Sequence, residues 1–419
     1  MANKRRVVIT GMGAVSPNGI GRHAFTEAIL AGRSGVRRIS RFDASQLSVQ
    51  IAGEIPDFDE LAWVDKKERR QVSRVLPLAI AAASEAFADS GIDPAKLSTD
   101  ELRRLGVIIG SGGGSQDFTE QQYDLFFHDK QRLMSVHCVP TTVMGTLSSD
   151  LSIRFGLRGP SHVVTTGCTS STDALAYATR QIQFGRADCV LSGGADSPIA
   201  LGIVKGFILM KIMTSSWNDQ PEQASRPFSV DRDGFVLAEG SWMFVLEEFE
   251  HAKARGAHML AEIVGYGSTC EAFHRVRLQE CGEEPARAIG LAMQEAGVTP
   301  QDVQYVNLHG TSTQLNDRIE TRALKLALGD ERARQVPMSA LKSQIGHPQG
   351  ACGAAGVAAT IIAMHSGQLP PTLNLQNPDP ICDLDYVPQA GRKAAVEHAI
   401  ANCIAFGSKN SALVLRRAS

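Results

Sequence analysis

One arrangement of helix and strand occurs twice in the chain, once in each half. The segment at 81–94, "AAASEAFADSGIDP", is an amphipathic helix that ends at a glycine and a proline, and the apolar strand "RLGVIIGSGGG" follows at 104–114. The segment at 291–300, "LAMQEAGVTP", ends in the same way, and "VQYVNLHGTST" follows at 303–313 as a strand that runs into a polar turn. A glycine with a proline shortly after it is a typical helix stop. Apolar strands that alternate with helices predict mostly parallel α/β sheets that are covered on both faces.

The two halves also share a glycine corner that precedes a helix of small residues. This corner occurs at Gly167 in "GCTSSTDALAYA" and at Gly346 in "GHPQGACGAAGVAA". Helices with such small side chains usually run through a crowded interior, where backbones approach closely. We therefore predict two similar α/β halves, residues 1–255 and 256–419, that share a central helical layer. The boundary between them is expected near 252–262.

Charge and apolar content exclude several classes of protein. A net charge of −2 over 419 residues gives neither a basic field for nucleic acid nor a polybasic stripe for a membrane surface. No apolar stretch approaches the length of a bilayer span, and the N-terminus lacks the apolar core of a signal peptide. The eight cysteines are scattered, with no C-x-x-C pair and no zinc-type spacing. We expect a cytoplasmic protein with free thiols and no metal, nucleic acid or membrane partner.

Cys168 lies where a strand expected at 163–166 meets a helix. Thr169, Ser170, Ser171 and Asp173 are candidates for the residue that caps this helix. A cysteine at a helix start meets unpaired backbone N–H groups and the positive end of the helix dipole, and both favour thiolate over thiol. The position therefore predicts a nucleophile, although an arbitrary cysteine is more often a buried structural residue.

Two histidines and a lysine occupy corresponding places in the second half. His309 ends the strand at 303–313, and Lys342 and His347 flank the glycine-containing turn of "LKSQIGHPQG". The carboxyl ends of strands are where α/β folds place their chemistry. We expect Cys168, His309 and the loop that holds His347 to meet at one site. A lone histidine is more often structural, but two histidines that converge on a helix-start cysteine indicate catalysis.

These segments resemble the β-ketoacyl-acyl-carrier-protein synthases, the elongating condensing enzymes of the thiolase fold. The likeness runs through "RRVVITGMGAVSPNG", "RPFSVDRDGFVLAEG", "HGTSTQLNDRIET", "KSQIGHPQGACGAAG" and "NCIAFGSKN" in unbroken order. It implies the five-layer αβαβα arrangement. "TTGCTSSTDAL", "QLNDRIET" and "NPDPICDLDYVP" are more similar to ketosynthase-alpha subunits of type II polyketide synthases than to the fatty-acid enzymes.

The resemblance implies a Cys-His-His active site at Cys168, His309 and His347. Capture of an acyl group from a carrier protein requires a covalent intermediate, which the sulfur of Cys168 would form. Decarboxylation of a malonyl extender then creates an enolate, and two imidazole N–H groups can stabilise its oxygen. By the same resemblance, the backbone N–H groups of Cys168 and Phe406 form the oxyanion hole, and Phe406 gates the acyl pocket.

The remaining site residues also come from the resemblance. Lys342 is expected to supply positive charge near the site, where the carboxylates of Asp317 and Glu320 hold it; the alternative is a solvated surface lysine. Thr311 and Thr313 are expected to bind the phosphopantetheine arm, with strand-end capping as the alternative. No cofactor is expected, because the phosphopantetheine arrives on the acyl carrier protein. The expected partners are that carrier and a second subunit, in a homodimer or in a heterodimer with a chain-length-factor-like chain.

The sequence departs from the family pattern at several of these places. Gly356 stands where many relatives have a glutamate that helps to hold the lysine. Asn316 replaces the glycine of the fatty-acid branch, although the polyketide branch shares asparagine there. Ser408 and Lys409 replace a Gly-Thr pair beside the gate. These changes put the lysine network and the gate in question.

Several alternative functions remain open at this stage. "GMGAVSPNG" and "GSGGGS" lack the spacing of a dinucleotide-binding turn, so we give that function little weight. A cysteine hydrolase needs no second histidine. A homodimeric fatty-acid synthase II is the alternative enzyme, and a polyene product is an alternative within the polyketide branch. A non-catalytic chain-length-factor-like subunit is the alternative from another class, and the presence of Cys168 argues against it.

Overall fold

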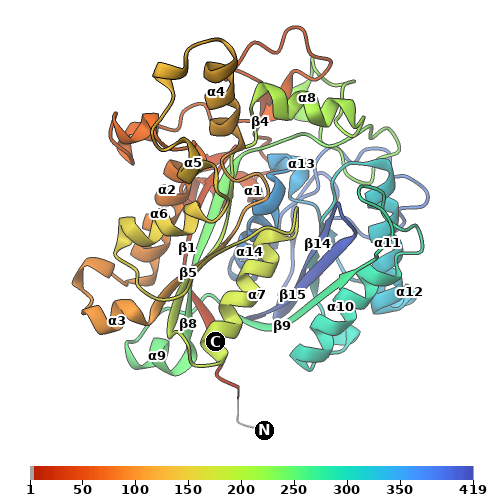
Figure 1. The fold of residues 1–419 in the computed structure, drawn as a ribbon. Helices are drawn as coiled ribbons and strands as arrows, with labels where there is room; N and C mark the ends of the chain where they lie inside the picture. The colour runs from red at the N-terminus through yellow and green to blue at the C-terminus, as the bar shows by residue number, and fades with distance from the viewer. Residues whose placement is uncertain (1–3, 419) are drawn as a thin grey trace.

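The order of the strands in the main sheet shows the duplication directly. The computed structural model describes residues 4–418 (Figure 1), and its sheet runs β11-β10-β14-β15-β9-β1-β8-β7-β5-β6. The five strands that each half contributes to this order can be numbered 1 to 5 along the chain. Read from the edge of the sheet toward its centre, they then have the order 3-2-4-5-1 in both halves. The first strands of the halves, β1 and β9, pair antiparallel at Val8 and Glu262 and join them. The prediction of a duplicated α/β fold is confirmed.

The elements have the following bounds. The strands of the main sheet are β1 (Val7–Ser16), β2 (Gly19–Ile20), β5 (Leu105–Gly110), β6 (Ser161–Val164), β7 (Cys189–Asp196), β8 (Gly240–Glu248), β9 (Ala261–Cys270), β10 (Tyr305–Asn307), β11 (Met338–Ser339), β14 (His398–Ala405) and β15 (Lys409–Arg417). Two small pairs are β3 (Val36–Arg38) with β4 (Ile51–Gly53), and β12 (Gln368–Leu369) with β13 (Arg392–Lys393). The helices are α1 (Arg22–Leu30), α2 (Val75–Ser90), α3 (Thr99–Arg103), α4 (Gln116–Phe127), α5 (Cys138–Thr142), α6 (Thr146–Phe155), α7 (Ser170–Gln183), α8 (Leu201–Leu209), α9 (Phe249–Ala254), α10 (Glu283–Ala296), α11 (Gln314–Leu328), α12 (Asp330–Gln335), α13 (Lys342–Ile345) and α14 (Cys352–Ser366).

The expectation of mostly parallel sheets is wrong. In each half the two outermost pairs are parallel, and the next two pairs are antiparallel: β7–β8 and β8–β1 in the first half, β14–β15 and β15–β9 in the second. All nine residues of β8 are buried. A strand covered on both faces is a continuous apolar run whichever way it points, so the sequence pattern does not reveal its direction.

The layers are those that the resemblance implied. α2 packs on β1 and β8 on one outer face, and α10 packs on β9 and β15 on the other, with α11 against α10. Between the halves, α7 and α14 lie side by side at the centre of the molecule (Figure 1) and contact strands of both halves. Thirteen of the fifteen residues of α14 are buried, which explains its Ala- and Gly-rich sequence.

The same close contact holds the outer helix of each half to its sheet. A Cβ on Gly13 of β1 would lie 2.0 Å from the carbonyl oxygen of Ala82 in α2, and a Cβ on Gly267 of β9 would lie 1.9 Å from that of Ala288 in α10. Only glycine permits this approach. The repeated contact places the two halves in equivalent geometry.

Several boundaries differ from those expected. The strand predicted to begin at 303 and to run into a polar turn is only Tyr305–Asn307, and the amides of residues 309–311 in the turn bond to carboxylate side chains. The division at residue 255 stays a prediction; in the structure α9 ends at Ala254 and β9 begins at Ala261. Of the helices in residues 4–418, none combines the length and hydrophobicity needed to cross a membrane.

Candidate active site

Cys168 lies in the tight connection between β6 and α7. Gly167 precedes it with a φ of 75°, a left-handed conformation that favours glycine. α7 begins at Ser170, and within the described chain its N-cap, Thr169, makes no side-chain capping bond. Ser170 instead accepts a hydrogen bond from the amide of Thr166, which closes the turn. The expected side-chain cap is therefore absent, and the turn presents Cys168 just before the first turn of the helix.

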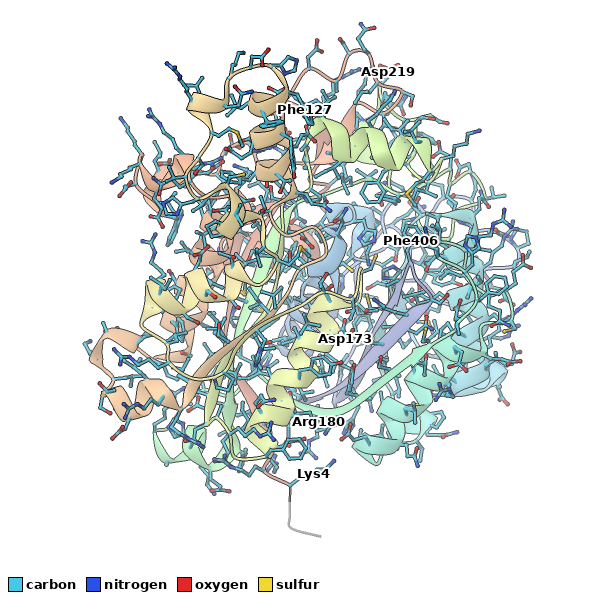
Figure 2. The ribbon with its side chains drawn as sticks, in the orientation of Figure 1. Lys4, Phe127, Asp173, Arg180, Asp219 and Phe406 are labelled. Atoms are coloured by element: carbon cyan, nitrogen blue, oxygen red, sulfur yellow. The ribbon has the colours of Figure 1, made fainter. Side chains whose placement is uncertain are left out.

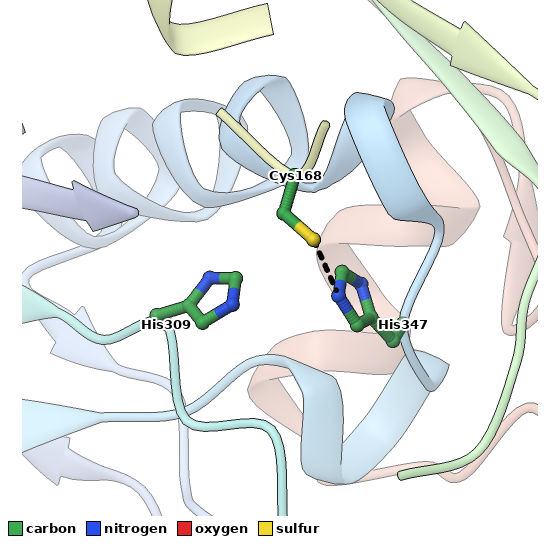
Figure 3. Close-up of side chains that lie close together, drawn as sticks. All are labelled: Cys168, His309 and His347. Atoms are coloured by element: carbon green, nitrogen blue, oxygen red, sulfur yellow. Dashed lines mark hydrogen bonds between the residues drawn. The ribbon is translucent and has the colours of Figure 1, made fainter. Parts of the chain in front are cut away.

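The three predicted catalytic side chains meet, as Figure 3 shows. Cys168 Sγ lies 3.2 Å from His347 Nε2. The rings of His309 and His347 lie 5.4 Å apart and almost perpendicular, at 88°. One side-chain atom from each of the three residues lies within 4.8 Å of the others. The prediction that strand ends of both halves bring these residues together agrees with the structure.

Backbone contacts fix each histidine. His309 follows β10, and its amide donates to Glu320 Oε1 at 2.6 Å. His347 follows α13, and its amide donates to the carbonyl oxygen of Val236 at 2.7 Å. The two imidazoles thus face Cys168 from separate segments, each with its backbone held in place.

Lys342 is buried beside His309 and is not a surface lysine. Its ammonium donates to the carbonyl oxygen of His309 at 2.6 Å and lies 3.3 Å from His309 Nδ1. Cys403 Sγ lies 3.4 Å from the same Nδ1. With these donors at Nδ1, the proton of a neutral His309 ring belongs on Nε2.

The expected ion pair between Lys342 and carboxylates does not form among residues 4–418. Glu320 instead accepts hydrogen bonds from the amides of His309 and Gly310 and from the side chain of Asn402. Asp317 pairs with Arg232 at 3.2 Å and accepts from the Thr311 amide. The carboxylates hold the loop that carries His309, because its amides lie closer to them than the ammonium does.

Gly356 explains the missing carboxylate partner. A Cβ at this position would lie 2.6 Å from Asn307 Oδ1. A glutamate could enter only if Asn307 moved, so the space that the acid would occupy is taken by an amide.

Two cavities meet at Cys168. The larger, of about 320 Å³, is lined by Thr311, Thr313 and both histidines, and the smaller, of about 210 Å³, by Phe207 and Gln349 among others. Cys168, His347, Phe235 and Phe406 border both cavities. The sulfur therefore lies at a junction between two chambers.

Two phenylalanines form this junction. Phe406 is half-buried and lies in the turn between β14 and β15 (labelled in Figure 2). The ring of Phe235 stands 5.5 Å from that of His347, at 73°. Apart from its place in the "DRDGFVLAEG" motif, nothing in the sequence indicated a role for Phe235.

The turn after Phe406 is tied to the wall of the larger cavity. Ser408 has a φ of 65°, donates its hydroxyl proton to the carbonyl oxygen of His274, and accepts from the Glu271 amide through its own carbonyl. His274 lines the larger cavity. The serine that departs from the family pattern thus anchors the turn that bears Phe406.

Burial decides the protonation of the catalytic groups. It raises the pKa of the half-buried Cys168 thiol to about 12, although the Lys342 ammonium and the Phe406 amide oppose this. Burial, reinforced by Lys342, lowers the pKa of His309 to about 3, and burial also lowers the pKa of His347. The expectation of a resting thiolate is wrong, because desolvation outweighs the helix start. The resting site holds a neutral thiol beside two neutral imidazoles.

Comparisons with known proteins agree with this geometry. Residues 4–252 match the family model of the beta-ketoacyl synthase N-terminal domain, and residues 260–376 match that of the C-terminal domain. The tetracenomycin polyketide synthase ketoacyl synthase alpha subunit of Streptomyces glaucescens is 42% identical over 421 residues, which cover 99% of this chain and 97% of that protein. The 3-oxoacyl-[acyl-carrier-protein] synthase 2 of Vibrio harveyi is 40% identical over 415 residues, 99% of each chain.

The solved structure of the ishigamide ketosynthase/chain length factor matches with a TM-score of 0.91 and 32% identity over the whole of both chains. The fold is that of the thiolase-fold ketosynthases. The chain belongs to the beta-ketoacyl synthase family of condensing acyltransferases.

Proposed function

We propose that the chain carries out decarboxylative Claisen condensation of a malonyl-acyl-carrier-protein with an acyl chain held on Cys168, as the ketosynthase of a type II polyketide synthase. The observation that carries this proposal is a thiol at the junction of two cavities, within 4.8 Å of two imidazoles. Neither cavity alone needs to hold both reactants, so one can receive the acyl chain and the other the pantetheine arm.

The first half-reaction loads the sulfur. Cys168 Sγ attacks the carbonyl carbon of the acyl thioester, and its proton passes to Nε2 of His347, 3.2 Å away, and then to the departing pantetheine thiolate. The backbone amides of Cys168 and Phe406 are the donors for the tetrahedral oxyanion. The Phe406 amide opposes the rise in the pKa of Cys168, which supports this role.

The second half-reaction forms the carbon–carbon bond. Malonyl-carrier binds in the larger cavity, with Thr311 and Thr313 on its pantetheine arm. The carbon–carboxylate bond breaks, CO2 leaves, and the electron pair becomes an enolate whose oxygen accepts from Nε2–H of His309. It also accepts from Nε2–H of His347, once exchange with water has moved the ring proton of His347 from Nδ1, where loading leaves it, to Nε2. The enolate carbon then attacks the Cys168 thioester, and the sulfur departs as the leaving group. Neutral imidazoles suit this step because each keeps an N–H for the developing charge.

The chemistry calls for no bound cofactor, since every step uses side chains, backbone amides and the arm of the carrier. The proposed substrates and partner are therefore acyl-carrier and malonyl-carrier. The name of the Vibrio harveyi relative supports the carrier, and the alpha-subunit relative supports the polyketide branch. We also propose a cytoplasmic location, supported by eight free cysteines.

A second subunit is part of the proposal. The face formed by α4 and α5 exposes the apolar side chains of Tyr123, Phe126, Phe127, Val136 and Val139, and Phe127 is 73% exposed at the end of α4 (Figure 2). The ring of Phe127 packs against those of Tyr123 and Phe126, and an exposed apolar cluster of this kind favours an interface. The ishigamide ketosynthase/chain length factor supports a heterodimer with a chain-length-factor-like chain. The second candidate is a homodimeric fatty-acid synthase II, which the Vibrio harveyi relative favours.

Intact-mass measurement tests the nucleophile. Wild type, Cys168→Ala and the control Cys270→Ala, an exposed cysteine, are mixed with acyl-carrier. We expect an acyl adduct on wild type and on Cys270→Ala only. An adduct on Cys168→Ala rules out the proposed nucleophile. Co-expression with a candidate second subunit then separates the branches, because a stable homodimer that elongates saturated acyl-carriers alone rejects the polyketide proposal.

A further inference from the structure

Two cysteines that the proposed mechanism does not use lie directly behind the active site. Cys352 is the first residue of α14, and Cys403 lies within β14. Both are free thiols and almost fully buried, at 5% and 1% exposure. Their sulfur atoms lie 3.6 Å apart. Residues that are 51 positions apart in sequence thus form a thiol pair in van der Waals contact.

This thiol pair is connected to the catalytic residues. The backbone carbonyl oxygen of Cys168 lies 3.2 Å from Cys352 Sγ and 3.0 Å from Cys403 Sγ. Cys403 Sγ also lies 3.4 Å from His309 Nδ1. Neither Cys352 nor Cys403 lines the two cavities that meet at Cys168. A change in the position or oxidation state of these two sulfur atoms therefore affects Cys168 and His309 through their contacts with the pair, and not through contact with the substrate.

The cluster could in principle take a soft metal or a disulfide. His309 Nδ1, Cys352 Sγ and Cys403 Sγ lie within 4.8 Å of one another. A metal ion would have to take Nδ1, which already faces the Lys342 ammonium at 3.3 Å, and two cations in one buried site repel each other strongly. A disulfide adds no charge. The local charges favour the disulfide.

We propose that Cys352 and Cys403 are a site of reversible oxidation, and that the disulfide formed between them slows condensation by displacing Cys168 and His309. The two thiols together lose two protons and two electrons, and one S–S bond forms. A diazene oxidant takes both hydrogens and becomes a hydrazine; a small-molecule disulfide takes them as two thiols. Added dithiol reverses the reaction.

Two features of the site favour this chemistry. The sulfur atoms lie 3.6 Å apart and need to approach by roughly 1.5 Å to reach the S–S bond length of about 2.05 Å. Burial opposes a thiolate on Cys352, but hydrogen bonding with Cys403 and the charge of Lys342 outweigh it and lower the pKa of Cys352 well below its usual range. Thiol–disulfide exchange begins from the thiolate.

The effect on activity follows from the lost hydrogen bonds. Disulfide formation removes the Cys403 S–H, which lies 3.0 Å from the Cys168 carbonyl oxygen and 3.4 Å from His309 Nδ1, and it draws Cys352 Sγ away from its place 3.2 Å from the same carbonyl. The carbonyl sits at the start of α7, and a shift there moves the Cys168 sulfur relative to His347. This second half of the inference rests on the proposed function; formation of the disulfide does not.

Disulfide mapping tests the first half. The Cys168→Ala protein, which keeps seven of the eight cysteines, is treated with diamide, alkylated after denaturation and digested. We expect a peptide linked through Cys352 and Cys403, and two fewer alkylated thiols than in the reduced protein. The link disappears in Cys168→Ala/Cys352→Ala. Seven alkylated thiols after oxidation, or a link between other cysteines, overturns the inference.

Condensation assays test the second half. Wild type, Cys352→Ala and Cys403→Ala are each compared with their own reduced activity, after thermal melting shows that each is folded. We expect diamide to slow wild type at least about tenfold, less than the loss of a whole oxyanion donor, and dithiothreitol to restore it. Each variant should lose less than about twofold, and that residual loss reports oxidation of Cys168 itself.

Equal losses in wild type and variants refute the effect on catalysis even if the disulfide forms. If no form of the protein condenses substrates, the proposed function fails instead, and the mapping experiment still decides whether the disulfide exists.

Discussion

Replacing Lys342 with methionine isolates the role of the buried ammonium. Methionine keeps much of the side-chain volume but removes the charge and the donor that lies 2.6 Å from the His309 carbonyl and 3.3 Å from Nδ1. Two effects on His309 follow. Its pKa rises from about 3 because one of the causes of its depression is gone, and the proton is no longer directed to Nε2.

The second effect decides the outcome. Burial is the larger cause of the low pKa of His309 and remains in the variant, so the ring stays neutral near pH 7. What is lost is a charge-assisted hydrogen bond to Nδ1, and such bonds contribute about 1.5–3 kcal/mol. If this energy holds the Nε2–H tautomer, the rate of decarboxylation and condensation falls about 10- to 150-fold. Loading of Cys168 falls far less, because His347 serves that step.

Single-turnover assays separate the two steps. Acyl transfer to Cys168 is followed by intact mass, and CO2 release from malonyl-carrier is measured on the preloaded enzyme. Lys325→Met is the matched control, since Lys325 lies on α11 and pairs with Asp383 away from the site. Equal loss in both steps, or no loss in CO2 release, refutes the tautomer argument.

Three further outcomes are expected. Gly356→Glu should lower the free energy of unfolding by about 1–3 kcal/mol through overpacking, as measured by thermal and urea denaturation. The control Gly290→Ala, whose Cβ would meet nothing within 4 Å, should leave the stability of the protein unchanged. Equal denaturation curves for the two variants would contradict the packing argument. The pKa of His309 is about 3 in the folded protein and near 6.5 in the unfolded chain, so the unfolded chain binds the extra proton between these values. The free energy of unfolding should therefore fall as pH drops from about 6.5 toward 3, by at most about 1.4 kcal/mol per pH unit for this group. His309→Gln should reduce that slope in urea titrations at stepped pH. Thr311→Val and Thr313→Val should each raise KM for pantetheine thioesters by about fivefold, the loss of one hydrogen bond, with kcat nearly unchanged; a fall in kcat alone would assign them a different role.

The residues that meet at the site were predictable from sequence because each lies in a turn next to a regular element. Cys168 lies between β6 and α7, His309 follows β10, and His347 lies between α13 and α14. The duplicated pattern predicted that these turns meet at one site. The partners of Lys342 were not predictable, since Glu320 and Asp317 bond to backbone amides that exist only once the loop has folded. Those same bonds hold the polar turn after β10, which the sequence predicted without its bonding partners.

The direction of the strands and the contact between Cys352 and Cys403 could not be predicted from sequence, because both depend on how elements pack in the folded protein. Fully buried strands such as β8 carry the same apolar signal whether parallel or antiparallel. Cys352 and Cys403 seemed scattered, and their sulfur atoms come together only because α14 packs against β14 at the centre. The protonation of Cys168 likewise depends on how deeply the fold buries it.

The two cavities that share Cys168 and Phe406 allow the growing chain and the incoming carrier to bind at the same time. In the proposed cycle, an acyl chain bound in the smaller cavity leaves the entrance of the larger cavity free for the pantetheine arm of the next carrier. Binding of the carrier and binding of the growing chain therefore take place in different cavities. The end of the smaller cavity limits the length of the product, and substitutions there can change that length without changing how the carrier binds.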